Sequence, residues 1–241
     1  MLRLFRRRRR RSRTAAPTIT PRSEGLAAVR VELAELTPAA EPFLGQAGYL
    51  LLVLFENLGR AVALAPTTAA KTTLSRAAAQ VLEAHEGLVT ELLSSGADPV
   101  AAMDPFRQPL DEYQRRIEGN DWAEILVTCY LTTGFLTDFF VGVAGGLPPG
   151  LADRVALLLD VDRAEQVLEG ELRSLIEQNP RMASRLAMWG RRLIGDTMLV
   201  ARSALVAAPG ADGPQLDRIE PVFTELIGAH TRRMDALGLT A

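Results

Sequence analysis

The chain is poor in the residues that build the most common metal and nucleophile sites, with one cysteine and two histidines among 241 residues. A single cysteine, Cys129, excludes both a disulfide framework and a cysteine-rich metal site. Its apolar surroundings predict a buried core residue. Because an isolated thiol fits a reducing compartment, we expect a cytoplasmic protein. The sequence also lacks a Gly-rich phosphate loop, a nucleophile elbow and zinc-type ligand spacing.

Aromatic residues are scarce as well, at 5% of the chain, whereas hydrophobic residues make up 48% and are mostly alanine and leucine. Strands favour β-branched and aromatic side chains, so this composition predicts packed helices rather than sheets. Neither an alternating strand pattern nor a tandem repeat is present. The length allows one large domain or two small ones with a substantial core.

The near balance of charge, a formal net charge of −2, hides an uneven distribution. Residues 1–13 hold eight arginines and no acid, which leaves 19 basic and 29 acidic residues elsewhere and a net charge of about −10 there. No apolar segment follows this arm, so we expect no signal peptide. A basic arm on an acidic body predicts contact with RNA or another anionic surface, the alternative being a solvated tail. The consecutive arginines are Arg6, Arg7, Arg8, Arg9, Arg10 and Arg11.

Prolines, glycines and polar clusters divide the chain into long helical patterns. We expect an arm over residues 1–24, a linker or short helix over 25–43, and one helical domain over 44–241. The segment "DPFRQPLDEYQRRIEGND" indicates an irregular connector with short helical turns. The expected helices cover residues 44–65, 67 or 68 to the "SSGADP" segment, 122–145, 151–178, 181–206 and 215–236.

Four long helices with additions at the C-terminal side predict an all-α protein built on a four-helix bundle. A helical membrane protein is the alternative, because residues 43–65 and 125–147 are nearly long and apolar enough to span a bilayer. The second segment carries only one charge, Asp138, and a central acid costs about 2.5–3.5 kcal/mol on insertion. Since the remaining helices are plainly amphipathic, buried bundle helices explain more of the sequence.

Each of the four bundle helices places one ionisable residue among apolar ones on its inward face, with Asp162 at the edge of the last. An unpaired buried carboxylate is costly, so these groups are expected to meet one another, a cation or arginine partners. The alternative is that each is an isolated polar position, satisfied by water or by Arg60 and Arg154. The four inward residues are Glu56, His85, Asp138 and Glu165.

This set falls short of a dimetal-carboxylate centre, which needs a glutamate from two helices and a Glu-x-x-His pair from each of the others. Leu82, not an acid, stands three residues before His85. On the last helix Asp162 is followed by Glu165 where the second histidine belongs. We therefore expect no cofactor, while a carboxylate-rich site for iron or another divalent cation stays as an alternative.

Two further segments carry residues of interest. His230 lies near the end of a helix that we expect to be exposed, and we expect its side chain to be solvated. Trp189 is followed by Arg191 and Arg192, which predicts either a stacking and phosphate-contact patch or a salt-bridged helix face.

Six segments carry a family resemblance: "ALAPTTAAK", "GADPVAAMDPF", "DWAEILVTCY", "TDFF", "NPRMASRLAMWGRRLIGD" and "HTRRMDALGL". Over residues 45–238 the chain resembles actinobacterial ferritin-like proteins related to the tRNA hydroxylases that act on methylthio-isopentenyl-adenosine. The last two segments are the most specific. The resemblance implies an all-α, ferritin-like four-helix bundle with additional C-terminal helices. In the hydroxylase relatives it also implies a non-haem di-iron site that acts with dioxygen, with an acid near the position of Leu51.

The resemblance also implies which metal ligands have changed. Glu56 and Asp138 stand at matching positions, and His85 is what is left of the acid-x-x-His pair of the second helix. Asp162 matches the acid of the other pair, with Glu165 in place of its histidine. We therefore expect a divergent ferritin-like protein with an incomplete dimetal site and no catalytic role. The alternative is a non-haem iron, oxygen-dependent hydroxylase that uses a carboxylate-rich site.

Overall fold

A computed structural model describes residues 33–206 and 216–239, and every regular element in these residues is a helix. The expected all-α class, with additional helices at the C-terminal side, is confirmed. The Arg-rich arm and its arginines lie outside the described residues. The elements are η2 (Leu33–Leu36), α1 (Ala40–Leu64), α2 (Thr68–Ser94), α3 (Pro99–Arg116), α4 (Trp122–Ala144), α5 (Leu151–Leu158), α6 (Asp162–Gln178), α7 (Met182–Val206) and α8 (Leu216–Ala236).

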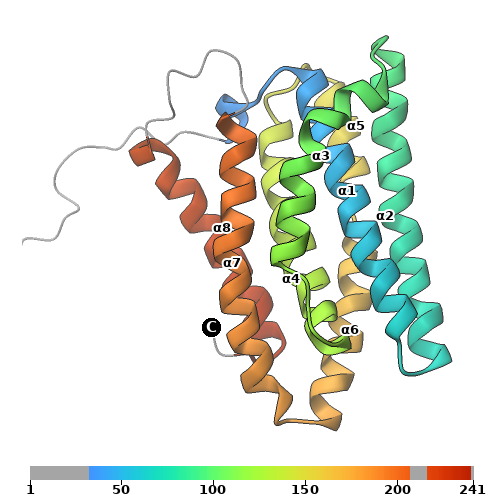
Figure 1. The fold of residues 1–241 in the computed structure, drawn as a ribbon. Coiled ribbons are helices and arrows are strands. Elements are labelled where there is room, and N and C mark those ends of the chain that lie inside the picture. The colour runs from blue at the N-terminus through green and yellow to red at the C-terminus, as the bar shows by residue number, and fades with distance from the viewer. Residues whose placement is uncertain (1–32, 207–215, 240–241) are drawn as a thin grey trace, which may run out of the picture.

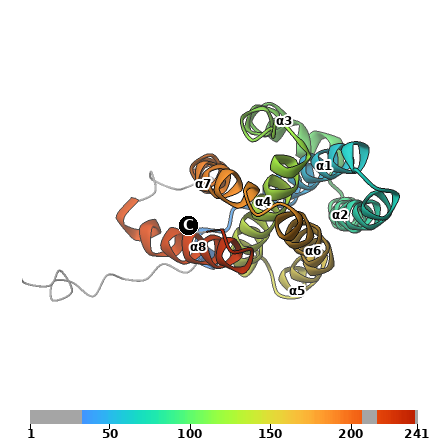
Figure 2. The ribbon, with the colours of Figure 1, turned by 90° about the horizontal axis from the view of Figure 1, so that it is seen from below.

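Helices α1, α2, α6 and α4 form the four-helix bundle, each packing against the next in that order (Figure 1). Helix α4 is central, because it also contacts α7 and α8 on its other side (Figure 2). Helix α3 packs on the outside of α1 and touches α7. The result is a bundle flanked by an outer layer of α3, α7 and α8, with one continuous apolar core.

Local sequence signals set several of the helix ends. The Thr67 side chain accepts a hydrogen bond from the Ala70 amide at 3.1 Å and so caps the N-terminus of α2. Asp121 caps α4 in the same way, accepting from the Glu124 amide at 3.0 Å. Gly96, with φ of 83°, follows the end of α2 in a conformation that L side chains rarely adopt.

The expected irregular connector after α2 is wrong: α3 is a continuous helix through Pro105 and Pro109. Both prolines are exposed, so the carbonyl groups left without intrahelical partners face solvent. The helix is held by tertiary packing, with Ala102 and Tyr113 buried against its neighbours. Gly45 of α1 permits this packing, because a methyl group there would overlap the Ala102 carbonyl group.

The single helix expected over residues 151–178 is instead two, α5 and α6, separated by residues 159–161. Leu159 and Val161 are buried, so the break points two apolar side chains into the core. The Asp160 side chain accepts a hydrogen bond from the Asp162 amide at 3.2 Å, which helps to start α6.

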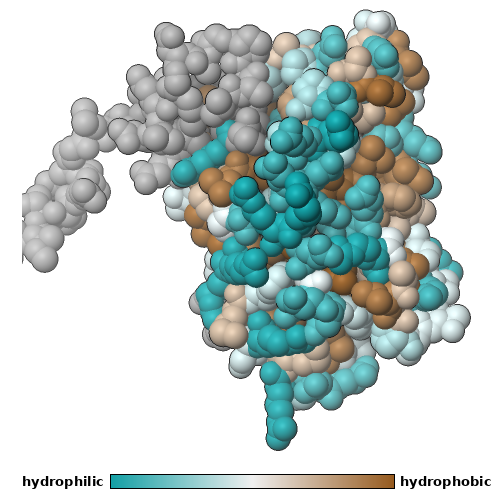
Figure 3. All heavy atoms as spheres, viewed as in Figure 1, coloured by the Kyte–Doolittle hydropathy of each residue, from teal (hydrophilic) through white to brown (hydrophobic). Residues whose placement is uncertain are grey.

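Two of the described helices, α1 and α4, are long and apolar enough to cross a membrane by length and composition. The most apolar window of α4 is 78% buried within the bundle, and that of α1 is 50% buried. Burial against other helices therefore accounts for the composition of α4. On the face seen in Figure 3, hydrophilic residues predominate and hydrophobic ones form separate patches.

Candidate functional site

One half-buried cation joins three helices where α4, α6 and α8 meet. The Arg233 guanidinium of α8 donates from Nη1 to Asp138 Oδ2 at 2.7 Å and from Nη2 to Asp138 Oδ1 at 3.1 Å. Its Nε donates to Glu165 Oε1 at 2.5 Å. The pairing with Asp138 is bidentate, the geometry in which arginine binds a carboxylate most strongly. We call Asp138, Glu165 and Arg233 the Arg233 clasp.

A glycine shapes the slot that receives this guanidinium. Gly134 lies one helical turn before Asp138 on α4, so both face the same way. A methyl group at Gly134 would overlap the Nε and Cζ atoms of Arg233. The guanidinium therefore lies directly against the α4 backbone, which fixes it in place between the two carboxylates.

Burial and charge act in opposite directions on Arg233. Its side chain is 15% exposed, compared with 21% for Glu165 and 36% for Asp138. Burial by itself lowers the pKa of the guanidinium, but the hydrogen bonds to Asp138 and Glu165 outweigh it and raise that pKa above its usual value. Arg233 is thus a permanent cation whose charge is neutralised within the protein.

A cleft of about 360 Å³ opens beside the clasp. The ring of Tyr130 is buried at its base, and burial, followed by the charges of Glu169 and Glu165, raises the pKa of its hydroxyl to about 12. Tyr130 therefore stays neutral at ordinary pH, where it can exchange hydrogen bonds but cannot act as a base. Besides the clasp, the cleft is lined by Tyr130, Ala229, Arg232 and Ala236.

Of the five residues predicted as a metal cluster, the structure joins Asp138 and Glu165 through Arg233. Glu56 is exposed, so the prediction that it points inward is wrong. His85 is half-buried at the edge of the apolar face of α2, and its Nδ1 lies 2.9 Å from the Gly48 carbonyl oxygen. Asp162 is exposed and, with Asp138, lines a second cleft of about 440 Å³.

The residues present do not fit a dimetal-carboxylate centre. In the described part of the chain, no three His, Cys, Asp or Glu side chains lie together in a way that could hold a metal ion. The only fully buried carboxylate there is Glu124, which accepts from the Asn120 amide at 2.9 Å and from Arg185 at 3.2 Å. The meeting faces of α1, α2 and α6 are aliphatic, with buried Leu54, Leu58, Leu74, Val81, Leu88 and Leu168.

The expectation that His230 is solvated is wrong, because the residue is 4% exposed. Burial lowers the pKa of its imidazole to about 4; the Gly190 backbone opposes this in part, and the nearby charge of Arg233 adds a smaller lowering effect. Neither ring nitrogen has a hydrogen-bond partner among the described residues. His230 is therefore a neutral imidazole in the contact of α8 with the rest of the molecule.

A periodic signal places His230 in the core. The buried residues of α8 are spaced three and four apart, with Phe223 and Leu226 before the histidine and Met234 after it. That spacing is typical of the inward face of a helix. The same periodicity leaves Arg233 beside this face, next to α4 and α6.

A family model of the ferritin-like domain of actinomycetes matches residues 38–209, from just before α1 into the segment after α7. No curated protein matches the chain. The matched span contains the whole four-helix bundle, whereas α8 and Arg233 follow it. The chain therefore belongs to the actinomycete family of ferritin-like domains.

Proposed function

We propose that this protein uses the ferritin-like fold without a dinuclear metal centre, as a non-catalytic binding protein of the cytoplasm. The observation that carries the proposal is the Arg233 clasp. Three N–H groups of one guanidinium occupy Asp138 and Glu165, the two inward carboxylates that a metal would need. A permanent cation already neutralises them, so a divalent ion would first have to displace it.

The position of the clasp supports the same proposal. Arg233 comes from α8, beyond the span that matches the family, so an added helix supplies the cation. The neighbouring interior of the bundle is aliphatic where α1 and α2 meet, with Leu58 and Val81 fully buried. Neither region offers the mixed carboxylate and histidine set of a dimetal centre.

Metal analysis after anaerobic loading with Fe²⁺ tests this proposal. Following removal of free iron, we expect no stoichiometric iron in the wild-type chain or in His85→Ala. Glu56→Gln serves as a control, because Glu56 is exposed and away from the clasp. Two irons per chain that are lost in His85→Ala would overturn the proposal.

The enzyme alternative has its own signature. We propose a relationship to the tRNA hydroxylases from the segments "NPRMASRLAMWGRRLIGD" and "HTRRMDALGL". Oxygen consumption by the protein would support a hydroxylase activity. An absorption band that depends on iron would have the same meaning. Either observation would replace the non-catalytic proposal with an oxygen-dependent hydroxylase.

We propose in addition that Arg6–Arg11 contact RNA or another anionic surface. The concentration of eight arginines in residues 1–13, against a net charge of about −10 in the rest of the chain, supports this role. Deleting residues 1–13 should weaken binding to an anionic partner and make it less sensitive to salt. Unchanged binding after the deletion would remove the arm from the proposal.

A further inference from the structure

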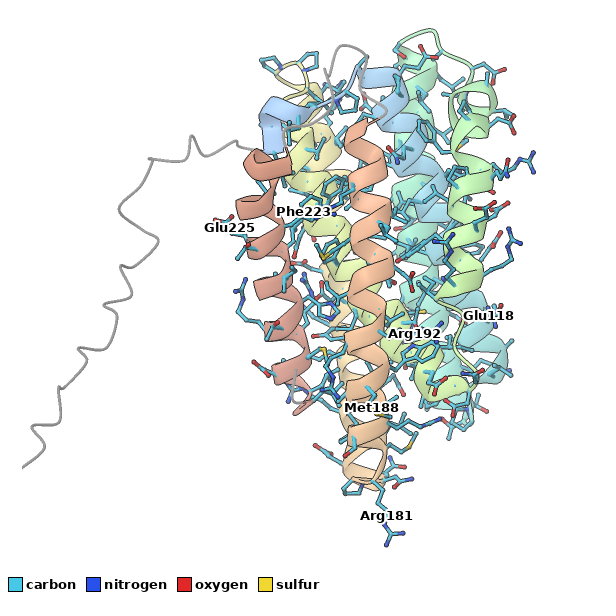
Figure 4. The ribbon with its side chains drawn as sticks, turned by 60° about the vertical axis from the view of Figure 1, so that its left-hand side comes forward. Glu118, Arg181, Met188, Arg192, Phe223 and Glu225 are labelled. Carbon is cyan, nitrogen blue, oxygen red and sulfur yellow. The ribbon has the colours of Figure 1, made fainter. Side chains whose placement is uncertain are left out.

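The outer face of α7 is exposed along the length of the helix whose side chains are described. Its residues recur every three or four positions, so they form one stripe on the helix. Figure 4 looks onto this helix, with Arg181 at its lower end and Met188 and Arg192 following along it. The α7 face, as we call it, consists of Arg181, Ser184, Met188, Arg191, Arg192, Gly195, Leu199 and Arg202.

The α7 face is basic and contains no acid. The single acid of α7, Asp196, is half-buried and lies to the side of the stripe. The nearby Glu118 is paired with Arg60 at 2.5 Å, so its charge is already compensated. Among the described residues, the positive charge of Arg181, Arg192 and Arg202 is therefore placed to attract an external anion.

The contacts described for two arginines of this face, Arg192 and Arg202, are with aromatic rings and a backbone carbonyl group. The Arg192 guanidinium lies 4.8 Å from the centre of the Trp189 ring and donates to the Arg116 carbonyl oxygen at 3.2 Å. Trp189 is itself fixed by a hydrogen bond from Nε1 to Thr128 Oγ1 at 2.8 Å. Arg202 lies 5.2 Å from the Phe223 ring. Ring and carbonyl contacts of this kind position the guanidinium groups of Arg192 and Arg202 and leave their charge unchanged.

Six arginines elsewhere in the described part of the chain form ion pairs, which Arg192 and Arg202 are not described as doing. The described ion pairs join Arg60 to Glu118, Arg107 to Asp104, Arg154 to Glu91, Arg173 to Glu169, Arg185 to Asp121 and Glu124, and Arg233 to Asp138 and Glu165. Of the two alternatives that the sequence left open, the contacts of Arg192 within the described residues are those of stacking on Trp189 and not of a salt bridge.

The α7 face also exposes two large apolar side chains. Met188 is 62% exposed and Leu199 is 56% exposed. They lie eleven residues apart, which is close to three helical turns, so both project from the same stripe as the arginines. A nucleic-acid backbone would use only the arginines, whereas the interface of an anionic bilayer uses both kinds of side chain.

We propose that the α7 face binds an anionic phospholipid surface. Arg181, Arg192 and Arg202 contact headgroup phosphates, and Met188 and Leu199 enter the boundary between headgroups and acyl chains. This inference rests on the proposed function, because it names the surface that a binding protein of this fold would meet. The vesicle test and the metal test can be told apart, because vesicle binding does not depend on the iron content of the protein.

Vesicle sedimentation of the full chain tests the charge requirement. The probe is a vesicle of phosphatidylglycerol and phosphatidylcholine, with pure phosphatidylcholine as the reference. Since one arginine near an anionic surface changes partitioning about fivefold, Arg181→Gln with Arg192→Gln should weaken binding about 25-fold. The matched pair Arg107→Gln with Arg173→Gln removes the same charge from other faces and should have little effect.

Three results would overturn the proposal. One is wild-type protein that does not bind the anionic vesicles at low salt. Another is an equal loss of binding in the two arginine pairs, which would make the attraction non-specific. The third is α7-dependent binding to a single-stranded RNA oligonucleotide without α7-dependent binding to vesicles, which would assign the face to nucleic acid.

A fluorescent label tests whether the face enters the bilayer. Met188→Cys carries a nitrobenzoxadiazole label, and Leu157→Cys, at an apolar position 75% exposed on α5, is the matched control. The native Cys129 does not interfere, because it is buried and its thiol pKa is raised to about 12. We expect a blue shift on anionic vesicles at position 188 and none at 157. An unchanged spectrum at 188, or equal shifts at both positions, would overturn the proposal.

Discussion

The two sides of α4 are held by different kinds of interaction. On the side facing α1, aromatic rings pack edge to face, with Phe43 and Phe140 centroids 5.7 Å apart. On the side facing α8, Gly134 and Asp138 receive the Arg233 guanidinium. A substitution on the apolar side should lower the free energy of unfolding in proportion to the contacts that it removes. The polar side behaves as a unit, because removing one partner leaves the others half-buried and without their ion pairs.

The difference shows how a ferritin-like bundle can keep inward carboxylates without a metal. Asp138 and Glu165 both accept hydrogen bonds from one guanidinium that a third helix supplies. Their charge is used to attach α8, an element beyond the family match, to the bundle. The polar side of α4 therefore serves attachment, and its aromatic side serves core stability.

The largest expected effect comes from breaking the aromatic side. Phe43 is 1% exposed, and Phe43→Ala should lower the free energy of unfolding by about 3–5 kcal/mol, because it leaves a cavity beside Phe140. Urea unfolding measures this change. The control Leu157→Ala removes an exposed side chain and should change stability by less than about 0.5 kcal/mol. Equal effects of the two substitutions would contradict the proposed division of roles.

The next largest effect is a pH dependence on the α8 side. The folded-state pKa of His230, about 4, lies below its unfolded value of 6.5, so the unfolded chain binds more protons between these pH values. Stability is therefore retained above pH 6.5 and lost as the pH falls towards 4, by about 3 kcal/mol in total. Unfolding measured across this window should show a shallower slope in His230→Leu. An identical slope in that variant would show that other groups are responsible.

A smaller effect is expected from filling the guanidinium slot. Gly134→Ala places a methyl group where the Arg233 guanidinium lies, so it pushes Arg233 away from Asp138 and Glu165. We expect the free energy of unfolding to fall by about 2 kcal/mol, which is less than for the loss of a fully buried pair. The matched controls are Gly59→Ala and Gly170→Ala, in helix interiors with open space around them. These should stabilise the protein by about 0.5–1 kcal/mol, because alanine favours the helix. Stabilisation by Gly134→Ala as well would argue against the slot.

The smallest effect sharpens the contrast between buried and exposed arginines. Arg60 and Glu118 form an ion pair whose side chains are 36% and 49% exposed. Glu118→Gln should change stability by less than about 1 kcal/mol, and added salt should reduce the effect further. A loss as large as that of Gly134→Ala would mean that exposure does not separate the two kinds of pair.

Much of the fold could be predicted from the sequence because its helix ends are marked locally. Pro66 ends the first long helix, and Thr67 caps the next. The α3 helix could not be predicted in this way, because local chemistry at Pro105 and Pro109 opposes it and packing against α1 overrides that preference. The break before α6 was missed because Leu159 and Val161 continue the apolar pattern across it.

The candidate site could be predicted only in part. The apolar surroundings of Asp138 and Glu165 indicated inward carboxylates, and the structure brings these two together. Their partner comes from α8, and helix faces taken one at a time do not reveal which distant arginine meets them. Gly134, one turn before Asp138, is the local signal that a bulky group from another helix packs there.

The burial of Cys129 makes its thiol a natural probe of local opening in the core. Its thiol lies within α4, 1% exposed and protonated at ordinary pH, so a thiol reagent can react only after that part of the core has opened. When the reagent reacts faster than the core recloses, the labelling rate equals the rate at which the native core opens. Labelling of the native Cys129 thiol thus reports the opening of the core around α4 without any substitution in the chain.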